Sequence, residues 1–177
     1  MFSFVLANFR VAGSSGQLEI ALKEVLASIN GVKGSTLGGR VMADGDFPEG
    51  GYAVHLEKGT SDSNKVFSYA VLDPENNGLA EGQVLTGGQV VLTNVQVAEL
   101  CGLAQSTVTN LPCQGLEWQD AGNYLEIIFV SPELIAVNHQ LGSGFRTVGG
   151  VLEHQKTGQR VYFYVSLDSG LIVGDNL

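Results

Sequence analysis

The chain has 177 residues, enough for one domain with a sizeable core, and 44% of them are hydrophobic. This composition excludes an intrinsically disordered or low-complexity chain. Only 15% of the residues are charged and the net charge is −9. An acidic chain repels phosphate backbones and anionic lipid headgroups, so we expect neither nucleic acid nor a membrane surface as a partner.

A strand, a turn and a helix are the first predicted elements. Residues 2–11 are rich in aromatic and β-branched side chains and predict a strand, and residues 13–16 predict a turn after it. Residues 18–29 predict the main helix, because their apolar side chains recur every three or four positions on one face. We expect Asn30 and Gly31 to end this helix.

A glycine-rich loop is predicted over residues 31–51, with a short strand at 40–43. Asp44, Asp46 and Glu49 lie in this loop. Three carboxylates at such spacing are adequate ligands for calcium. They lack the full pattern of a calcium-binding loop, however, so we expect solvated carboxylates and assign no metal site.

Short strands separated by turns are predicted for the rest of the chain. Residues 52–56 and 66–72 alternate apolar and polar side chains, and residues 148–154 and 159–167 predict a hairpin. Further strands are predicted at 83–85, 89–92, 124–130, 134–137 and 171–173, with a turn at 73–78. The sequence therefore predicts a single α+β domain over 1–177, in which the main helix packs on an antiparallel sheet or sandwich.

Residues 92–111 carry a motif with helical spacing. Val97 and Ala98 are a branched and a small residue, and Gly102 follows the alanine by four positions. In this respect the stretch resembles the helix-turn-helix unit of bacterial and phage repressors, and the resemblance implies a DNA-binding regulator. The stretch contains no Lys or Arg to neutralise phosphates, so we expect instead a short buried helix followed by a loop or strand.

No residue pattern identifies a catalytic or metal site. His55, His139 and His154 are far apart in the sequence, and none has the spacing of a zinc site or a known catalytic motif. Cys101 and Cys113 are the only cysteines. We expect free, buried thiols, although a bridge would close a loop of about 13 residues. We predict no enzyme activity and no cofactor.

One aromatic cluster indicates a ligand site. Trp118 and Tyr124 lie close to Glu117 and Asp120 in the sequence. Aromatic rings offer stacking surfaces and the carboxylates offer hydrogen-bond acceptors, a combination that suits a carbohydrate. The same composition is equally typical of the capped edge of a hydrophobic core.

The low charge density favours a protein that packs against other proteins. A folded monomer of 18.7 kDa exposes on the order of 8,300 Å², about 300 Å² per charged residue, where an average chain has about 190 Å². Residues 66–145 contain eight acids and no Lys or Arg. This acidic stretch could face a basic patch on a scaffold.

We therefore predict a non-enzymatic structural subunit that forms a homo-oligomer or a larger particle. Decoration and tail subunits of virions are proteins of this general kind, and the comparison is by analogy, without a shared motif. No signal peptide or membrane-spanning stretch is recognisable, so the expected location is the cytoplasm or a virion. Carbohydrate binding is the alternative function, and a helix-turn-helix regulator is a further one that the charge disfavours.

Overall fold

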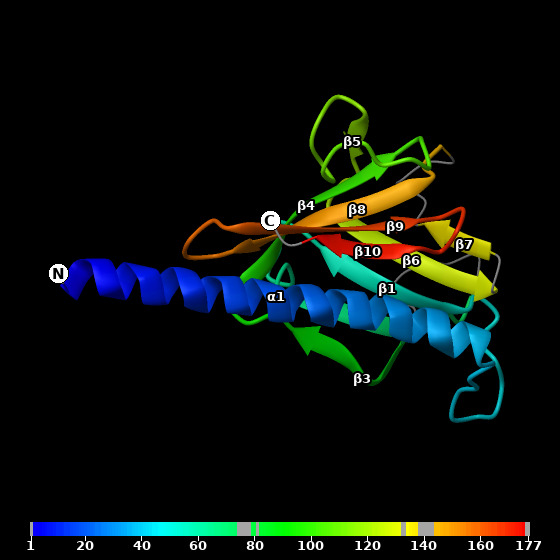
Figure 1. Ribbon diagram of the computed structural model, residues 1–177. Coiled ribbons are helices and arrows are strands. Elements are labelled where there is room, and N and C mark those ends of the chain that lie inside the picture. The colour runs from blue at the N-terminus through cyan, green and yellow to red at the C-terminus, as the bar shows by residue number, and fades with distance from the viewer. Residues whose placement is uncertain (1, 74–78, 81, 132–133, 138–143, 176–177) are drawn as a thin grey trace.

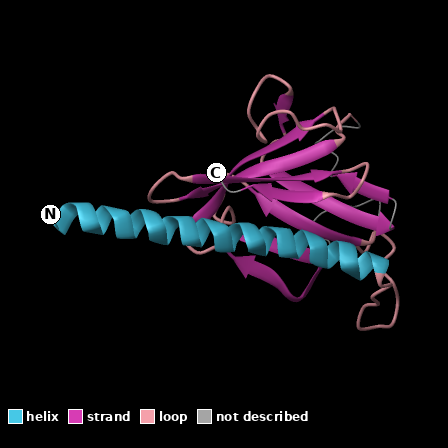
Figure 2. Ribbon diagram, viewed as in Figure 1, coloured by secondary structure: helices cyan, strands magenta, loops and turns pink. Residues whose placement is uncertain are grey.

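One helix packs against two antiparallel β-sheets (Figures 1 and 2). The structure is a computed structural model that describes residues 2–73, 79–80, 82–131, 134–137 and 144–175. Within these ranges each sheet has five strands. The expected α+β fold, β-rich with one main helix, is confirmed.

The two sheets are built from different parts of the chain around the helix α1 (Phe2–Leu37). The first sheet has the order β3-β2-β1-β6-β7, with β1 at Tyr52–Glu57, β2 at Lys65–Ala70, β3 at Gln83–Val91, β6 at Tyr124–Ser131 and β7 at Leu134–Val137. The second has the order β10-β9-β8-β4-β5, with β4 at Val95–Leu103, β5 at Trp118–Asp120, β8 at Thr147–His154, β9 at Arg160–Ser166 and β10 at Ile172–Asp175.

A single core joins the helix to both sheets. The predicted helical stripe is confirmed: Leu22, Val25 and Ile29 are at most 4% exposed. They belong to one buried cluster with side chains from the first sheet, such as Tyr52, and from the second, such as Phe163. The helix thus closes the apolar space that neither sheet could cover alone.

The start of the helix differs from the prediction. Residues 2–11 form no strand and residues 13–16 form no turn, because both belong to α1. For residues 13–16 the physical reason lies in contacts with the hairpin of β8 and β9. Ser14 is 2% exposed and donates a hydrogen bond to the Gln159 side chain. Gln17 Oε1 lies 2.6 Å from His154 Nε2. Tertiary contacts of this kind override the local preference of residues 13–16 for a turn.

The end of the helix also lies later than predicted. Asn30 and Gly31 do not end it, and residues 40–43 form no strand. The last turns are held in place because Thr36 donates a hydrogen bond of 2.9 Å to the carbonyl oxygen of Phe129. The helix then ends before Gly39, whose φ of 62° is the left-handed conformation that glycine adopts without strain.

Most predicted strands are confirmed, and two are joined. The strands predicted at 83–85 and 89–92 form the continuous β3, in which Gly87 has a φ of 71°. Opposite it, the register shifts between Phe67 and Tyr69 in β2. Most of the turn predicted at 73–78 lies outside the described residues.

The prediction of a short helix within residues 92–111 is wrong. The stretch therefore does not form the helix-turn-helix unit that its spacing resembles. This stretch contains the strand β4, which pairs with β5 and β8. A register shift between Val97 and Glu99 explains the misleading pattern. The extra residue places Leu100 in the same buried cluster as Val97, three positions earlier. A β-bulge thus reproduces the spacing of a helix.

Candidate functional site

The predicted carbohydrate site is split between the two sheets. Trp118 begins β5 of the second sheet, and Tyr124 begins β6 of the first. Trp118 is only 8% exposed and packs against Cys101 and Leu103. Its ring therefore offers little surface for stacking on a sugar.

The two predicted carboxylates have different surroundings. Asp120 Oδ1 lies 2.6 Å from Lys58 Nζ, and this hydrogen bond lowers the pKa of Asp120. Glu117 is exposed and accepts a hydrogen bond from Thr109. Trp118 and Asp120 do line one cavity of about 200 Å³, together with Lys58, Glu99, Leu100, Gln119 and the two cysteines.

The cysteines form a disulfide bond, so the expectation of free thiols is wrong. Their Cα atoms are 5.4 Å apart, because β4 carries Cys101 and the loop before β5 returns Cys113 to it. Neither thiol can then act as a nucleophile. The backbone of Cys113 is left-handed, with a φ of 63°.

A buried ionic cluster lies on the outer face of the first sheet, where sequence reasoning missed it. His55 Nδ1 lies 2.9 Å from Glu126 Oε1, and His55 Nε2 lies 2.9 Å from Glu57 Oε1. When both glutamates are ionised their oxygens can only accept, so both ring nitrogens then donate and the imidazole is protonated. The ring also stacks on Tyr124, with centroids 5.6 Å apart.

The surroundings of the cluster perturb its proton affinities. Burial alone would lower the pKa of His55, but the hydrogen bonds to Glu126 and Glu57 raise it above its ordinary value. Hydrogen bonds from Thr60 and then His55 lower the pKa of Glu57. Burial raises the pKa of Tyr69, and the nearby Glu126 raises it further.

Chemically, the cluster holds a proton between two carboxylates and presents no nucleophile. Glu126 Oε2 and Tyr69 Oη are buried without a hydrogen-bond partner among the described residues. The hydroxyl of Thr60 donates a hydrogen bond of 2.6 Å to Glu57. Alternation in β1 indicated which residues share a face. Only the pairing of His55 with Glu126 across β1 and β6 brought residues 71 positions apart together.

The loop acids show no metal-binding geometry. Asp44 Oδ1 accepts a hydrogen bond of 3.1 Å from the backbone N–H of Asp46, and both residues are exposed, as is Glu49. Among the described side chains, no group of three or more His, Cys, Asp or Glu could hold a metal ion. His139 lies outside the described residues.

Part of the acidic stretch at 66–145 is neutralised within the chain. Glu99 pairs with Arg160 at 3.1 Å. Asp120 pairs with Lys58, and Glu126 with His55. These contacts leave less negative surface to face a basic partner than the sequence alone implied.

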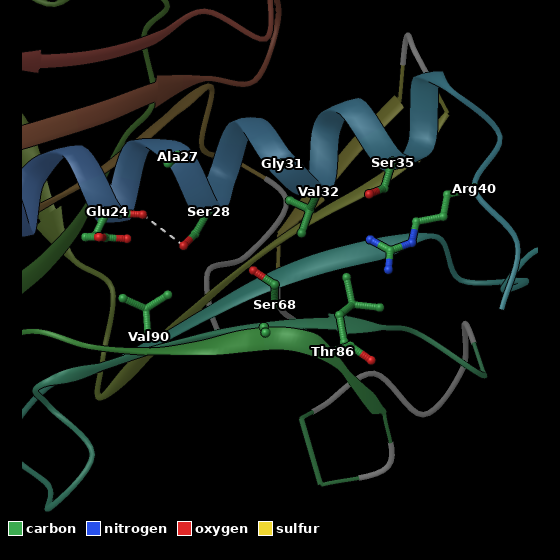
Figure 3. A pocket seen from close by; sticks show the side chains of 13 residues that line it. Glu24, Ala27, Ser28, Gly31, Val32, Ser35, Arg40, Ser68, Thr86 and Val90 are labelled. Carbon is green, nitrogen blue, oxygen red and sulfur yellow. Dashed lines mark hydrogen bonds between the residues drawn. The ribbon is translucent and has the colours of Figure 1, made fainter. Parts of the chain in front are cut away.

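A groove of about 280 Å³ runs between α1 and the edge strand β3 (Figure 3). Small or hydroxyl-bearing residues line most of it: Ala27, Ser28, Gly31 and Ser35 from the helix, Ser68 from β2, and Thr86, Gly87 and Gly88 from β3. Ser68 is 8% exposed, and its hydroxyl points into the groove without a hydrogen-bond partner among the described residues.

Charged side chains stand at the two ends of the groove. Glu24 and Arg40 both line it, and neither forms an ion pair with a described residue. The backbone of Arg40 is anchored to the first sheet, because its carbonyl oxygen accepts a 2.6 Å hydrogen bond from the Tyr52 hydroxyl. In a chain with a net charge of −9, an arginine without an acidic partner is unusual.

The N-terminal part of α1 extends past both sheets (Figure 1). In residues 2–11 seven of ten positions are apolar: Phe2, Phe4, Val5, Leu6, Ala7, Phe9 and Val11. At 3.6 residues per turn these positions spread over more than half of the helix circumference. Helices that are apolar on most sides are normally buried.

Comparisons with protein-family models, with curated proteins and with solved structures found no match for this chain. No described helix combines the length and apolar character needed to cross a membrane.

Proposed function

We propose that this protein is a structural subunit that works by self-association, and that the N-terminal part of α1 is its assembly element. The observation that carries the proposal is the apolar segment 2–11 on a helix that extends past its own sheets. Covering such a segment removes apolar surface from water, at about 25 cal/mol per Å². A second copy of the chain supplies an equivalent apolar surface.

Two further features support a packing role. Large apolar side chains remain exposed on the body, including Ile20 at 61%, Val91 at 55% and Leu171 at 55%. The strand β3 is the edge of its sheet and carries no charged residue in its nine positions. Solitary proteins usually guard such an edge with charges or proline.

Sedimentation velocity over a range of concentrations tests this proposal. We expect the wild-type protein to self-associate and the double variant Phe4→Glu, Phe9→Glu to stay monomeric, because the two charges prevent burial of the segment. Circular dichroism of the variant checks that the body remains folded. A wild-type protein that is monomeric up to about 1 mM, a range in which even weak association is detectable, contradicts the proposal.

The disulfide bond bears on where the protein works. Disulfides persist in oxidising environments and are rare in the reducing cytosol. The bond between Cys101 and Cys113 therefore favours a site outside the cytosol, such as a particle or a surface, over the cytoplasmic location expected from the sequence.

Carbohydrate binding is the second candidate, favoured by the cavity that Trp118 lines together with Lys58 and Asp120. Since Trp118 is the only tryptophan, its fluorescence would respond to a ligand in this cavity. A panel of neutral and acidic sugars tests the candidate, and unchanged emission at about 10 mM sugar, well above a millimolar Kd, rules it out.

A further inference from the structure

A second cavity lies beside the groove, and Arg40 stands between the two. The cavity has a volume of about 290 Å³, and the groove has about 280 Å³. Arg40, Leu85 and Thr86 line both, so the two spaces meet around the arginine side chain. Each volume lies near the lower end of the range for small-molecule pockets, about 300–1,000 Å³.

Arg40 presents a positive charge from a fixed backbone. Its N–H donates a 3.0 Å hydrogen bond to the carbonyl oxygen of Ser35, and its own carbonyl oxygen accepts one of 2.6 Å from the Tyr52 hydroxyl. The guanidinium forms no hydrogen bond or ion pair with a described residue. Figure 3 shows it turned into the space between α1 and the sheet, which the hydroxyls of Ser35 and Ser68 also face.

The second cavity is walled mainly by apolar side chains. Val41, Met42, Ala70 and Val84 are among them, and no acidic residue lines this cavity in the described part of the chain. Val41 is 52% exposed and Val84 is 44% exposed. A ligand with an apolar group would remove this surface from water, which is favourable.

A bulge in β3 shapes the wall that faces Arg40. Val84 pairs with Tyr69 and Gln89 pairs with Phe67, so residues 85–88 bulge opposite Ser68. A Cβ on Gly88 would lie only 2.4 Å from the carbonyl oxygen of Ser68, so glycine is needed for this close approach to β2. Bulges often lie beside binding sites, because they redirect side chains at a sheet edge.

We propose that Arg40 and the apolar cavity bind a small organic monoanion, a carboxylate that carries an aliphatic chain. The planar guanidinium offers two parallel N–H donors that match the two carboxylate oxygens. The chain of the ligand then covers Val41, Met42 and Val84 in the cavity beside Arg40. This inference goes beyond the proposed function and does not depend on it, because no residue of the segment 2–11 takes part.

Glu24 restricts the ligand to one negative charge. It lines the groove at the end away from Arg40, so a second anionic group extended along the groove would be repelled by its carboxylate. A second anionic group placed in the apolar cavity would lose its water without a cation to replace it. A dicarboxylate of the same length should therefore bind more weakly than a monocarboxylate.

Isothermal titration calorimetry of the full-length protein with sodium octanoate tests the site. We expect a Kd below about 1 mM, with a loss of up to about fourfold for each CH₂ removed from the chain. Octanedioate should bind at least about tenfold more weakly. Acetate, which is the head group alone, and octylamine, which has the opposite charge, should give no binding at about 10 mM.

Three variants separate the two parts of the site. Arg40→Gln should raise the octanoate Kd about tenfold, and it should fold normally because the hydrogen bonds of Arg40 use its backbone. Val84→Asn should raise the Kd about threefold by making the cavity more polar. Arg146→Gln is the matched control, since Arg146 is 63% exposed and lines neither space. Circular dichroism checks that each variant is folded.

Four results would overturn the proposal. The first is no heat of binding with octanoate at about 10 mM, and the second is an octanoate Kd that Arg40→Gln leaves unchanged. The third is binding of octylamine as tight as that of octanoate, because the positive charge would then have no role. The fourth is binding of acetate as tight as that of octanoate, because the apolar cavity would then have none.

Discussion

Replacing Gly31 by alanine should stabilise the folded monomer. Gly31 lies inside α1, and a Cβ there would have no atom within 4 Å. The substitution therefore adds no clash, while it removes the helix penalty of glycine, about 1 kcal/mol. We expect the free energy of unfolding of the monomer to rise by about that amount, and Tm by about 2–4 °C.

Urea denaturation at a concentration that favours the monomer measures this effect. The emission of Trp118, which is 8% exposed in the folded chain, should shift as the ring meets water. Gly158→Ala is the matched control, since Gly158 also has open space around it but has a φ of 70°. Alanine is strained there, so this control should lose about 1 kcal/mol.

A destabilised monomer would refute the view that the chain does not need this glycine. Equal shifts for Gly31→Ala and the Gly158 control would refute the conformational argument.

Three further predictions concern the body of the protein. His55→Leu should cost about 3–5 kcal/mol, since it leaves Glu126 buried without its cation. Because the pKa of His55 is raised above 6.5 on folding, its stabilisation should be complete below pH 6.5 and lost as pH rises through the folded pKa. The wild-type unfolding free energy measured from pH 6 to pH 9 should show this decline, and the variant should lack it. Replacing Cys101 and Cys113 by serine should lower the free energy of unfolding, measured by urea denaturation, by about 3 kcal/mol. The reason is that the unfolded chain is no longer closed into a loop between two cysteines that are 12 positions apart. Thr36→Val should cost about 1–3 kcal/mol in the same assay, because it removes the buried hydrogen bond that holds the end of α1.

Each of these expectations has a contrary outcome. A wild-type stability that rises between pH 6 and pH 9 would show that His55 is neutral in the folded chain. Free thiols detected in the untreated native protein would contradict the bond between Cys101 and Cys113. A Thr36→Val variant as stable as wild type would mean that water replaces the lost hydroxyl.

Local pattern was sufficient wherever one face of an element is buried along its whole length. The stripe at 18–29 was readable because burial of one helix face imposes a period of 3.6 on its apolar side chains. The alternation in residues 52–56 was readable because Tyr52, Val54 and Leu56 all face the main core. The same pattern determined the fold class. Composition likewise determined that the chain is acidic, with low charge density and many glycines.

Tertiary structure alone decided features that depend on residues distant in the sequence. The hairpin of β8 and β9 turns residues 13–16 into helix by contacting Ser14 and Gln17. A bulge in β4 gives a strand the spacing of a helix. Pairing of β1 with β6 assembles the cluster around His55.

The two kinds of information meet in α1. The sequence by itself determined which helical face is buried, because that face repeats its apolar residues locally. Only the folded structure decided that the helix is 36 residues long, that it extends past both sheets, and that its glycines face open space. The physical reason is that local spacing reports burial against the body, whereas helix length and empty space depend on where the sheets end.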